Sequence, residues 1–492
     1  MDSFMRRFSS RAAVLLAVFI FVISQFSVTG AARRAPSDNR AAQTQNADRS
    51  NKQSSSATLS AIRFGSNDER DRIVFDLSAI PKYDVNSLNG GKRIVLTMRG
   101  LKDKSKTKPT IKSDMVKRAA FQTLDDGLRI TIDLAEPLGY EVKTLKNPNR
   151  LFINFSKVYE HEYRSDKAEG LTFIDYVRRD KRGRFNAYLL DVDMSKYRLE
   201  PILANGVVQG RETVSEMSDD MNAVAAINAT YFERNGEIIG LLRMNDTIVG
   251  TTYFTRSSLG IKKNGNAIIE PASYTGLVTI GKASHYVAGV NVERGEDSLV
   301  IYNSYYGTTT GTNKYGREFT VRNGKVTNIQ QADSAIPEDG YVISVHGKAR
   351  NDFVRVRVGD KVTFVEDIGK KLKNVPDIIG AGPTLVKNGK VDVTAAKEEF
   401  PDDIAVGRAP RTGVAILPNN HMMLAVVDGR QAHSIGATLT EFAELLIKYG
   451  ARDAINFDGG GSSEMVIGGE IVNSPSDGQE RPVGSALGVF KR

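Results

Sequence analysis

Residues 58–160 contain an internal repeat, which restricts the fold of this part of the chain more than any other feature. Two segments align without a gap at an offset of 57 residues, so that Arg72 corresponds to Arg129. The matched positions are Arg72–Leu77 with Arg129–Leu134, Tyr83, Val85 and Leu88 with Tyr140, Val142 and Leu145, and Arg93–Leu96 with Arg150–Ile153. Apolar and polar residues alternate in each copy, which indicates half-buried strands. The shared register predicts two similar sheets packed together.

The second part of the chain, residues 165–492, combines short apolar strands with two helical patterns. The predicted strands are Ala187–Val192, Val224–Ile227, Leu424–Val427 and Ala454–Phe457. Two capping boxes, in which paired side chains satisfy free backbone N–H groups at a helix start, are Thr213 with Glu216 and Thr438 with Glu441. The second helix has one apolar face, and Gly450 follows it where a left-handed cap is expected. We therefore predict an α+β chain, with a small N-terminal β-sandwich followed by a larger mixed α+β domain.

The N-terminus has the features of an export signal. Arg6, Arg7 and Arg11 precede an apolar run from Ala12 to Val28, and small residues follow. This order is typical of a secretory signal peptide, although the run is also near the minimum length for a membrane anchor. Either alternative for residues 1–32 places the rest of the chain in the periplasm, the cell envelope or the medium. Residues 33–57 carry almost no large apolar side chain, which predicts a disordered linker.

The composition excludes several classes of function. The chain contains no cysteine, so disulfides, thiol nucleophiles and cysteine metal sites are excluded. Its formal net charge of +9 is spread along the chain without a nucleic-acid-binding signature. We expect no nucleic acid partner, but tolerance of polyanions such as wall polymers. The lysines at 102, 104, 106 and 108 either contact such a polymer or belong to a solvated loop.

Polar residues that could carry chemistry stand next to apolar strands at five places. The strongest signal is Asp458, which follows a strand and precedes Gly459, Gly460, Gly461, Ser462 and Ser463. Glycines let backbone N–H groups approach a ligand closely, and three in a row are costly in a simple turn. The other places are Arg411 with Thr412, Asp428 with Arg430 and His433, Asn228, and Glu480 with Arg481. Each has an ordinary alternative, such as a turn or a surface residue, but their shared position predicts one site assembled from several loops.

Two parts of the chain resemble known families. The segment Asn147–Phe155 resembles the ending of the AMIN domain, a small β-sandwich of exported bacterial proteins, which implies association with the envelope or peptidoglycan. Residues 170–492 resemble the phosphodiester glycosidase family in an ordered series of blocks: Asn228–Phe232, Gly380–Pro383 with Leu385 and Val386, Arg411 with Thr412, Asp428 with Gly429, Thr438–Leu446, Asp458–Ser463 and Arg481. The family's mammalian cysteines are absent here, and its Asn-Gly-Gly-Phe-Phe block differs at residues 229–231, which leaves the sugar open.

The second resemblance implies an exported hydrolase that cleaves a sugar 1-phosphodiester, similar to an N-acetylglucosamine-1-phosphodiester, in envelope glycans or phosphopolymers. Arg411 would clamp the phosphate with Arg481, and Asp458 would act as nucleophile or general base. Asp428 and His433 are secondary acid/base candidates. Substrate contacts are expected from Asn228, Thr412, Arg430, Glu480, Arg481 and Gly459–Ser463.

Three alternatives remain open from the sequence. A divalent cation held by Asp458 and Asn228 is an option, although no ligand cluster with metal-site spacing is present and no cofactor is otherwise implied. The chain could instead be a non-catalytic envelope polysaccharide-binding protein, which would need the arginines and glycines but no carboxylate. It could also act in exopolysaccharide biosynthesis, where the same site would serve as a transferase.

Overall fold

The computed structural model describes residues 56–251 and 254–492. The predicted signal or anchor, and all but the end of the predicted linker, lie outside the described residues. Strands make up 50% of the structure and helices 8%, so the chain is mostly β, and the predicted α+β class is confirmed only in part. The predicted helices are present but short. In the described part of the chain, no helix is both long and apolar enough to cross a membrane.

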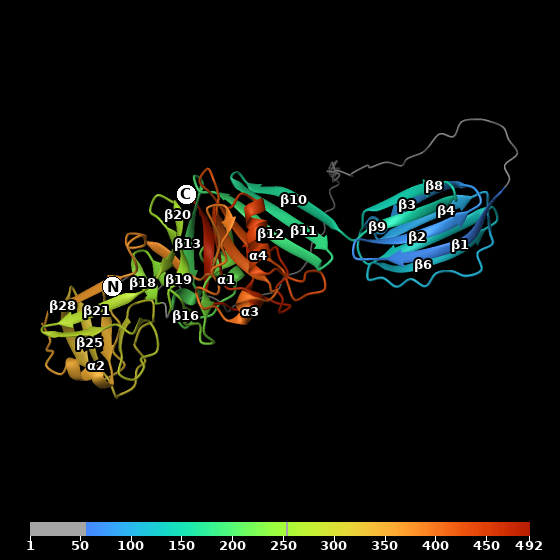
Figure 1. Cartoon of the computed structure of the whole chain (residues 1–492). Coiled ribbons are helices and arrows are strands. Elements are labelled where there is room, and N and C mark those ends of the chain that lie inside the picture. Colours follow the sequence, from blue (N-terminus) through green and yellow to red (C-terminus); the bar gives the residue numbers. More distant parts are fainter. Residues whose placement is uncertain (1–55, 252–253) are drawn as a thin grey trace, which may run out of the picture. The chain divides into compact units, whose positions relative to one another are not determined.

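Residues 57–156 form a small β domain of two sheets (Figure 1). The first sheet has the order β5-β1-β2-β9-β8 and the second the order β3-β4-β7-β6. Their strands are β1 Ala57–Ser66, β2 Arg70–Leu77, β3 Lys82–Leu88, β4 Arg93–Arg99, β5 Leu101–Asp103, β6 Val116–Leu124, β7 Gly127–Leu134, β8 Tyr140–Leu145 and β9 Arg150–Ser156. Alternate residues of both sheets pack into one apolar core, as the period-2 pattern predicted.

The two copies of the repeat are interleaved between these sheets. The first copy supplies β2 to the first sheet and β3 and β4 to the second, whereas the second copy supplies β7 to the second sheet and β8 and β9 to the first. The registers are equivalent, because Ile73 lies opposite Ile153 as Ile130 lies opposite Leu96. Each sheet therefore requires both copies, since one copy cannot bury its apolar face alone.

Repeated charges hold the same interleaved arrangement at the surface. Arg93 pairs with Asp133 at 2.6 Å, and the equivalent residues of the other copies, Arg150 and Asp76, approach to 3.5 Å. These pairs are partly exposed, so each adds only a little stability. Arginine and aspartate thus form equivalent pairs at matching positions of the two copies.

Residues 159–492 contain two larger sheets that pack face to face around one core. The long sheet has the order β10-β11-β12-β33-β32-β34-β30-β31, and the short sheet has the order β13-β37-β14-β35-β36. The long sheet contains β10 Tyr159–Ala168, β11 Leu171–Asp180, β12 Gly183–Asp193, β33 His421–Val427, β32 Arg411–Ile416, β34 Asp453–Asn456, β30 Thr384–Lys387 and β31 Lys390–Val391. The short sheet contains β13 Tyr197–Leu203, β37 Ser485–Lys491, β14 Ala225–Asn228, β35 Met465–Ile467 and β36 Glu470–Ile471. Strand β10 begins before residue 165, so it spans the interval between the two predicted domains.

Helices cover the outer faces of these two sheets. Helix α4, Leu439–Lys448, packs on the long sheet, and α1, Val214–Asp220, packs on the short sheet. Both begin with the predicted capping boxes, and Gly450 after α4 has a φ of +91°. The central strands of the long sheet are buried on both faces, which explains their continuous apolar sequences.

A third sheet closes the same core and carries an insertion. It has the order β18-β17-β29-β19-β20, with β18 Thr247–Gly250, β17 Leu242–Met244, β29 Asp377–Gly380, β19 Arg256–Ile261 and β20 Ala267–Ala272. Between β20 and β29 the chain forms β21 Thr275–Ile280, β22 Ala283–Tyr286, β23 Gly289–Val290, β24 Leu299–Tyr302, β25 Arg317–Arg322, β26 Lys325–Gln330, β27 Gly340–Val345, α2 Gly347–Asp352 and β28 Val362–Asp367 (Figure 1). These elements share a separate core with residues of the third sheet. The described residues also form a short hairpin of β15 Tyr231–Phe232 and β16 Ile238–Ile239, and helix α3 Asp402–Ala405. The 3-10 helices of the described chain are η1 Asn89–Gly91, η2 Ala204–Gly206 and η3 Gly460–Ser462.

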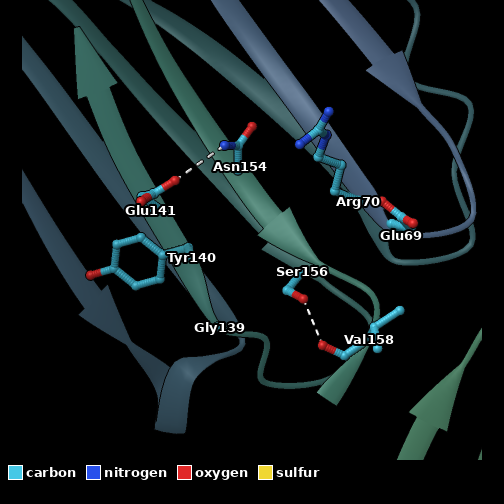
Figure 2. Close-up of a pocket in the computed structure, with 8 residues that line it drawn as sticks. All are labelled: Glu69, Arg70, Gly139, Tyr140, Glu141, Asn154, Ser156 and Val158. Atoms are coloured by element: carbon cyan, nitrogen blue, oxygen red, sulfur yellow. Dashed lines mark hydrogen bonds between the residues drawn. The ribbon is translucent and has the colours of Figure 1, made fainter.

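The N-terminal β domain has an open pocket of about 510 Å³ (Figure 2). It is lined by Glu69, Arg70, Gly139, Tyr140, Glu141, Asn154, Ser156 and Val158. The pocket contains none of the predicted catalytic residues. Its mixed charges and half-exposed Tyr140 provide a polar surface with one aromatic ring.

Candidate active site

The structure brings the predicted strand-end residues to one edge of the two large sheets. Arg411 lies opposite Val427, and Gly413 lies opposite Asn456, so β32 begins where β33 and β34 end. In the short sheet, β14 ends at Asn228. The chain then passes from β34 of the long sheet to β35 of the short sheet through Asp458–Glu464, which we name the crossing loop. The predicted glycines and serines therefore bridge the two sheets.

Asn228 holds the crossing loop in place. It is fully buried, and its amide nitrogen donates to the Asp458 carbonyl at 2.7 Å. Its side-chain oxygen accepts from the Thr412 hydroxyl at 2.8 Å and from the Glu464 N–H at 3.2 Å. Both polar atoms are thus occupied, and Thr412 is also fully buried. This arrangement makes Asn228 and Thr412 positioning residues and leaves no amide oxygen for substrate.

The same contacts argue against the cation that the sequence left as an option. The Asn228 oxygen already accepts two hydrogen bonds, so it is not a suitable ligand for a metal shared with Asp458. Across residues 56–251 and 254–492, no group of three or more histidine, aspartate or glutamate side chains has the geometry to hold a metal ion.

Asp458 is the carboxylate at the start of the crossing loop. Its N–H donates to the Ala229 carbonyl at 3.0 Å, which fixes its backbone. Burial raises the pKa of Asp458 to about 6, while hydrogen bonds from Ser462 and the Gly459 N–H, and the charge of Arg481, oppose the rise. The side chain is therefore mostly ionised at neutral pH, with a pKa near the range that suits a general base.

Two arginines pack against the glycines of the crossing loop. A Cβ atom on Gly461 would lie 1.9 Å from Nη2 of Arg481, and one on Gly460 would lie 3.2 Å from Nη1 of Arg430. Glycine at positions 460 and 461 leaves room for the two guanidinium groups beside the loop; a larger residue would require them to shift. Asp477 orients Arg481 through a 2.7 Å ion pair. The loop that begins with Asp458 is thus bordered by two cationic groups.

Arg411 is placed differently from its predicted role. It is 2% exposed, and its guanidinium donates to the carbonyls of Ala437, Ile404 and Gly407 at 3.0, 3.0 and 2.7 Å. Burial, together with the charge of Arg430, lowers the pKa of Arg411 to about 10. Three of its five N–H groups are already engaged, so little of the side chain is left for a phosphate.

Asp428 organises the neighbouring loop. It is 1% exposed; one oxygen accepts from the Tyr188 hydroxyl and lies 3.1 Å from Nε2 of His433. The other oxygen accepts from the Ser474 N–H at 3.0 Å and from the Asn473 amide at 3.2 Å. Asn473 also donates to the Ser463 carbonyl at 3.0 Å. Asp428 therefore orients the half-exposed His433 and is linked through Asn473 to the crossing loop.

Glu464 and Glu480 form a carboxyl pair behind the loop. Glu480 accepts hydrogen bonds from the hydroxyl and the N–H of Ser215 in the first turn of α1, at 2.6 and 3.3 Å. Glu464 is 2% exposed, and burial together with the charge of Glu480 raises the pKa of Glu464 to about 9. Glu464 is thus protonated at neutral pH. The predicted substrate contact Glu480 instead fixes the segment that carries Arg481.

A Glu464→Gln variant should become more stable than the parent chain as the pH rises. The pKa of the Glu464 carboxyl is about 9 in the folded chain, whereas the ordinary pKa of a glutamate, which applies in the unfolded chain, is 4.5. Between these values the folded chain binds more protons, so its free energy of unfolding falls with rising pH, and glutamine removes this loss. The difference between these two pKa values, about 4.5, corresponds to at most about 6 kcal/mol, so we expect the advantage of the variant to grow from less than about 1 kcal/mol at pH 5 to several kcal/mol at pH 9.

Urea unfolding at pH 5, 7 and 9 measures this difference. Glu444→Gln, at an exposed position of α4, is the matched control and should show no such trend. A Glu464→Gln chain that is less stable than the parent at pH 9 would show that the folded chain does not hold the Glu464 carboxyl in its protonated form.

Several residues of the site were not singled out by the sequence. They are Tyr188, Glu464, Asn473, Ser474 and Asp477. Tyr188 lies within an apolar strand, so nothing in the sequence indicates that its hydroxyl donates a hydrogen bond to Asp428. Two features of the sequence could have identified the others. Residues 473–477 have the composition of a loop that precedes Arg481, and Glu464 is an acidic residue directly before an apolar strand.

Comparisons with known proteins agree with this arrangement of motifs. The phosphodiester glycosidase family (NAGPA) matches residues 315–490, and the AMIN domain matches residues 61–155. An uncharacterised protein of Rickettsia conorii is 29% identical over 219 residues, which cover 42% of this chain and 76% of that protein. The human N-acetylglucosamine-1-phosphodiester alpha-N-acetylglucosaminidase is 39% identical over 103 residues, only 19% of this chain and 20% of that enzyme.

A solved structure extends the likeness of the fold over more of the chain. A hypothetical protein from Synechocystis has a TM-score of 0.60 and 23% identity, covering 89% of this chain and 81% of that chain. All candidate residues except Asn228 fall inside the segment matched by the glycosidase family. The chain therefore carries an AMIN domain over residues 61–155 and a phosphodiester glycosidase domain over residues 315–490.

Proposed function

We propose that this chain is an extracytoplasmic hydrolase of sugar 1-phosphodiesters, of the N-acetylglucosamine-1-phosphodiester type, in envelope glycans or phosphopolymers. The observation that carries the proposal is the crossing loop. It begins with the Asp458 carboxylate, and the guanidinium groups of Arg481 and Arg430 pack against its glycines. The substrate class follows the name of the human relative.

The chemistry of such a substrate fits these groups. Cleavage at the anomeric carbon releases a phosphate ester, which is a stable anion and needs little protonation. A cationic clamp on the phosphate and a carboxylate at the anomeric centre are the main requirements. In our proposal Arg481 and Arg430 bind the phosphate, and Asp458 acts as nucleophile or general base. His433, oriented by Asp428, supplies or accepts a proton at the exposed side of the site.

Arg411 takes a supporting role in this proposal. Its three hydrogen bonds to carbonyls hold residues 404–411 and 437 together beside the crossing loop. Gly459 lies so close to Pro410 that a Cβ atom would stand 2.8 Å from the Pro410 carbonyl oxygen. Arg411 therefore stabilises the segment against which the loop packs, and in our proposal the phosphate is bound by Arg430 and Arg481, which pack against Gly460 and Gly461.

The AMIN domain supports action on the cell envelope. Such domains imply envelope or peptidoglycan association, and the N-terminal residues have the composition of an export signal. In our proposal the AMIN domain keeps the hydrolase near glycan substrates, with the pocket of Figure 2 as a candidate contact for a polar polymer.

Arg481→Gln and Arg430→Gln should each lower kcat/KM for a sugar 1-phosphodiester by about 10²-fold, because each removes a cationic contact to the phosphate. The purified chain is offered defined sugar 1-phosphodiesters, and release of the reducing sugar is followed by NMR of the anomeric signals. Arg452→Gln, at an exposed position before β34, is the control and should leave the rate unchanged.

The products distinguish the three candidate functions. Release of free sugar supports a hydrolase. Transfer of the sugar to an added alcohol in preference to water would favour a transferase. Binding of the ester without turnover would favour a non-catalytic binding protein and overturn the proposal.

A further inference from the structure

Arg256, the first residue of β19, presents its guanidinium to aromatic rings. Its Cζ atom lies 3.8 Å from the centre of the Phe400 ring and 5.4 Å from that of the Phe254 ring. Among residues 56–251 and 254–492, no carboxylate or carbonyl accepts a hydrogen bond or ion pair from this side chain; the Arg256 carbonyl accepts from the Ser258 hydroxyl. Stacking occupies the faces of a guanidinium and leaves its N–H edge able to bind an anion.

A buried carboxylate links the segment that carries Arg256 to the segment that carries Phe400. Glu398 is 9% exposed and accepts hydrogen bonds from the N–H and the hydroxyl of Ser257 at 2.8 and 2.6 Å. It also accepts from the Thr384 N–H at 3.2 Å. Ser257 follows Arg256, and Phe400 lies two residues after Glu398. The position of Arg256 is therefore set by buried contacts.

Tyr231 connects this stack with the catalytic carboxylate. Its ring centre lies 5.8 Å from that of Phe400, and its hydroxyl accepts a 3.1 Å hydrogen bond from Asn456, two residues before Asp458. Burial raises the pKa of the Tyr231 hydroxyl; the charge of Asp458 raises it further, and the charges of Arg411 and Arg256 lower it. Tyr231 therefore contacts both the Phe400 ring, on which Arg256 stacks, and the strand end that leads to Asp458.

We propose that Arg256, stacked on Phe400, forms a second anion-binding subsite, which receives a charged group of the substrate next to the scissile phosphodiester. The proposal rests on the proposed function and names the substrate class more closely, as a polyanionic glycan. The charged group is either the next phosphate of a phosphopolymer or the carboxylate of an acidic residue.

Three esters test the subsite. All contain N-acetylglucosamine 1-phosphate, esterified to glycerol, to glycerol 3-phosphate or to glyceric acid, so that only the second charge differs. We expect the purified chain to prefer a charged ester over the glycerol ester by about 10-fold in kcat/KM, mainly through KM. The preferred charged ester identifies phosphate or carboxylate as the recognised group.

Arg256→Gln should reduce this preference ratio to about 1, and Arg256→Lys, which keeps the charge but not the planar stack, should retain part of it. Arg198→Gln is the matched control, because Arg198 also stacks on a phenyl ring, 5.1 Å from the centre of Phe490. Arg198 lies in β13, and its end of the short sheet is the one far from Asn228. The ratio should not change in this control.

The outcomes separate the subsite from the proposed function. A parent chain without preference, or an Arg256→Gln variant with the parental ratio, overturns the subsite while leaving hydrolysis intact. If no ester is cleaved, the proposed function fails, and binding of inorganic phosphate by calorimetry decides the subsite. In a chain with Arg430→Gln and Arg481→Gln, the added Arg256→Gln should raise the phosphate Kd about 10-fold; an unchanged Kd overturns the subsite.

Discussion

An Asp458→Asn variant should cleave a sugar 1-phosphodiester at least about 10³-fold more slowly than the parent chain. Asparagine keeps the shape of the side chain and can still accept hydrogen bonds from Ser462 and Gly459, but it cannot act as a nucleophile or base. The backbone contacts of residue 458 with Ala229 and Asn228 do not involve the carboxylate. The variant should therefore fold normally, and initial rates by NMR or a reducing-sugar assay measure the loss.

The pH dependence of the parent chain provides an independent check. Because the pKa of Asp458 is raised to about 6, kcat/KM should rise through pH 6 and fall about 10-fold between its plateau and pH 5. An acid limb near pH 4, or none at all, would show that another group carries the reaction.

The same pKa predicts the sign of a stability change. In the folded chain Asp458 binds a proton more tightly than in the unfolded chain, so ionisation at pH above 6 costs folding free energy. Asp458→Asn should be more stable than the parent at pH 7.5 by roughly 1–3 kcal/mol, and the advantage should vanish near pH 4. Asp339→Asn, at a side chain 61% exposed, is the control. Loss of both activity and stability at pH 7.5 would mean that the variant is misfolded.

Arg411→Ala should lower the free energy of unfolding by about 3–5 kcal/mol. The change leaves the carbonyls of Ala437, Ile404 and Gly407 without their donor in a site that is almost closed to water. Lysine should not rescue the variant, because one ammonium group cannot reproduce the planar fork that reaches three acceptors. Urea unfolding followed by circular dichroism measures the loss.

Arg430→Ala is the matched comparison for Arg411→Ala. Arg430 is exposed and packs against Gly460, so its removal should change stability by less than about 0.5 kcal/mol while lowering activity. An Arg411→Ala chain that keeps parental stability but loses affinity for the phosphodiester would instead make Arg411 the phosphate clamp.

The local elements of this fold could be predicted from the sequence because each of them depends on residues that are close together in the chain. The capping boxes at Thr213 and Thr438 and the cap at Gly450 satisfy backbone groups within a few residues, and all three were confirmed. The alternating strands of the repeat were confirmed for the same reason. The overall class was only partly confirmed, since the two helical patterns are short compared with the strands that surround them.

The roles of the polar residues were harder to predict. The sequence showed that polar groups stand where apolar strands end, and the structure brings them to one edge of two sheets. Arg411 and Arg481 were both predicted to bind phosphate, yet one donates to three carbonyls and the other lies against Gly461. Their local sequences do not differ in a way that reveals this.

By itself the sequence determined the alternating strands, the caps, the two family resemblances and the order of motifs along the chain, because these depend on short-range patterns. Only the tertiary structure decided that the repeat is interleaved between sheets, that Asn228 and Arg411 are saturated by buried partners, and that Glu464 meets Glu480. Partners such as Thr412 and Asn228 are 184 residues apart in the chain. Whether a polar group is buried, paired or left for a ligand depends on such distant neighbours, and burial in turn sets its charge and its role.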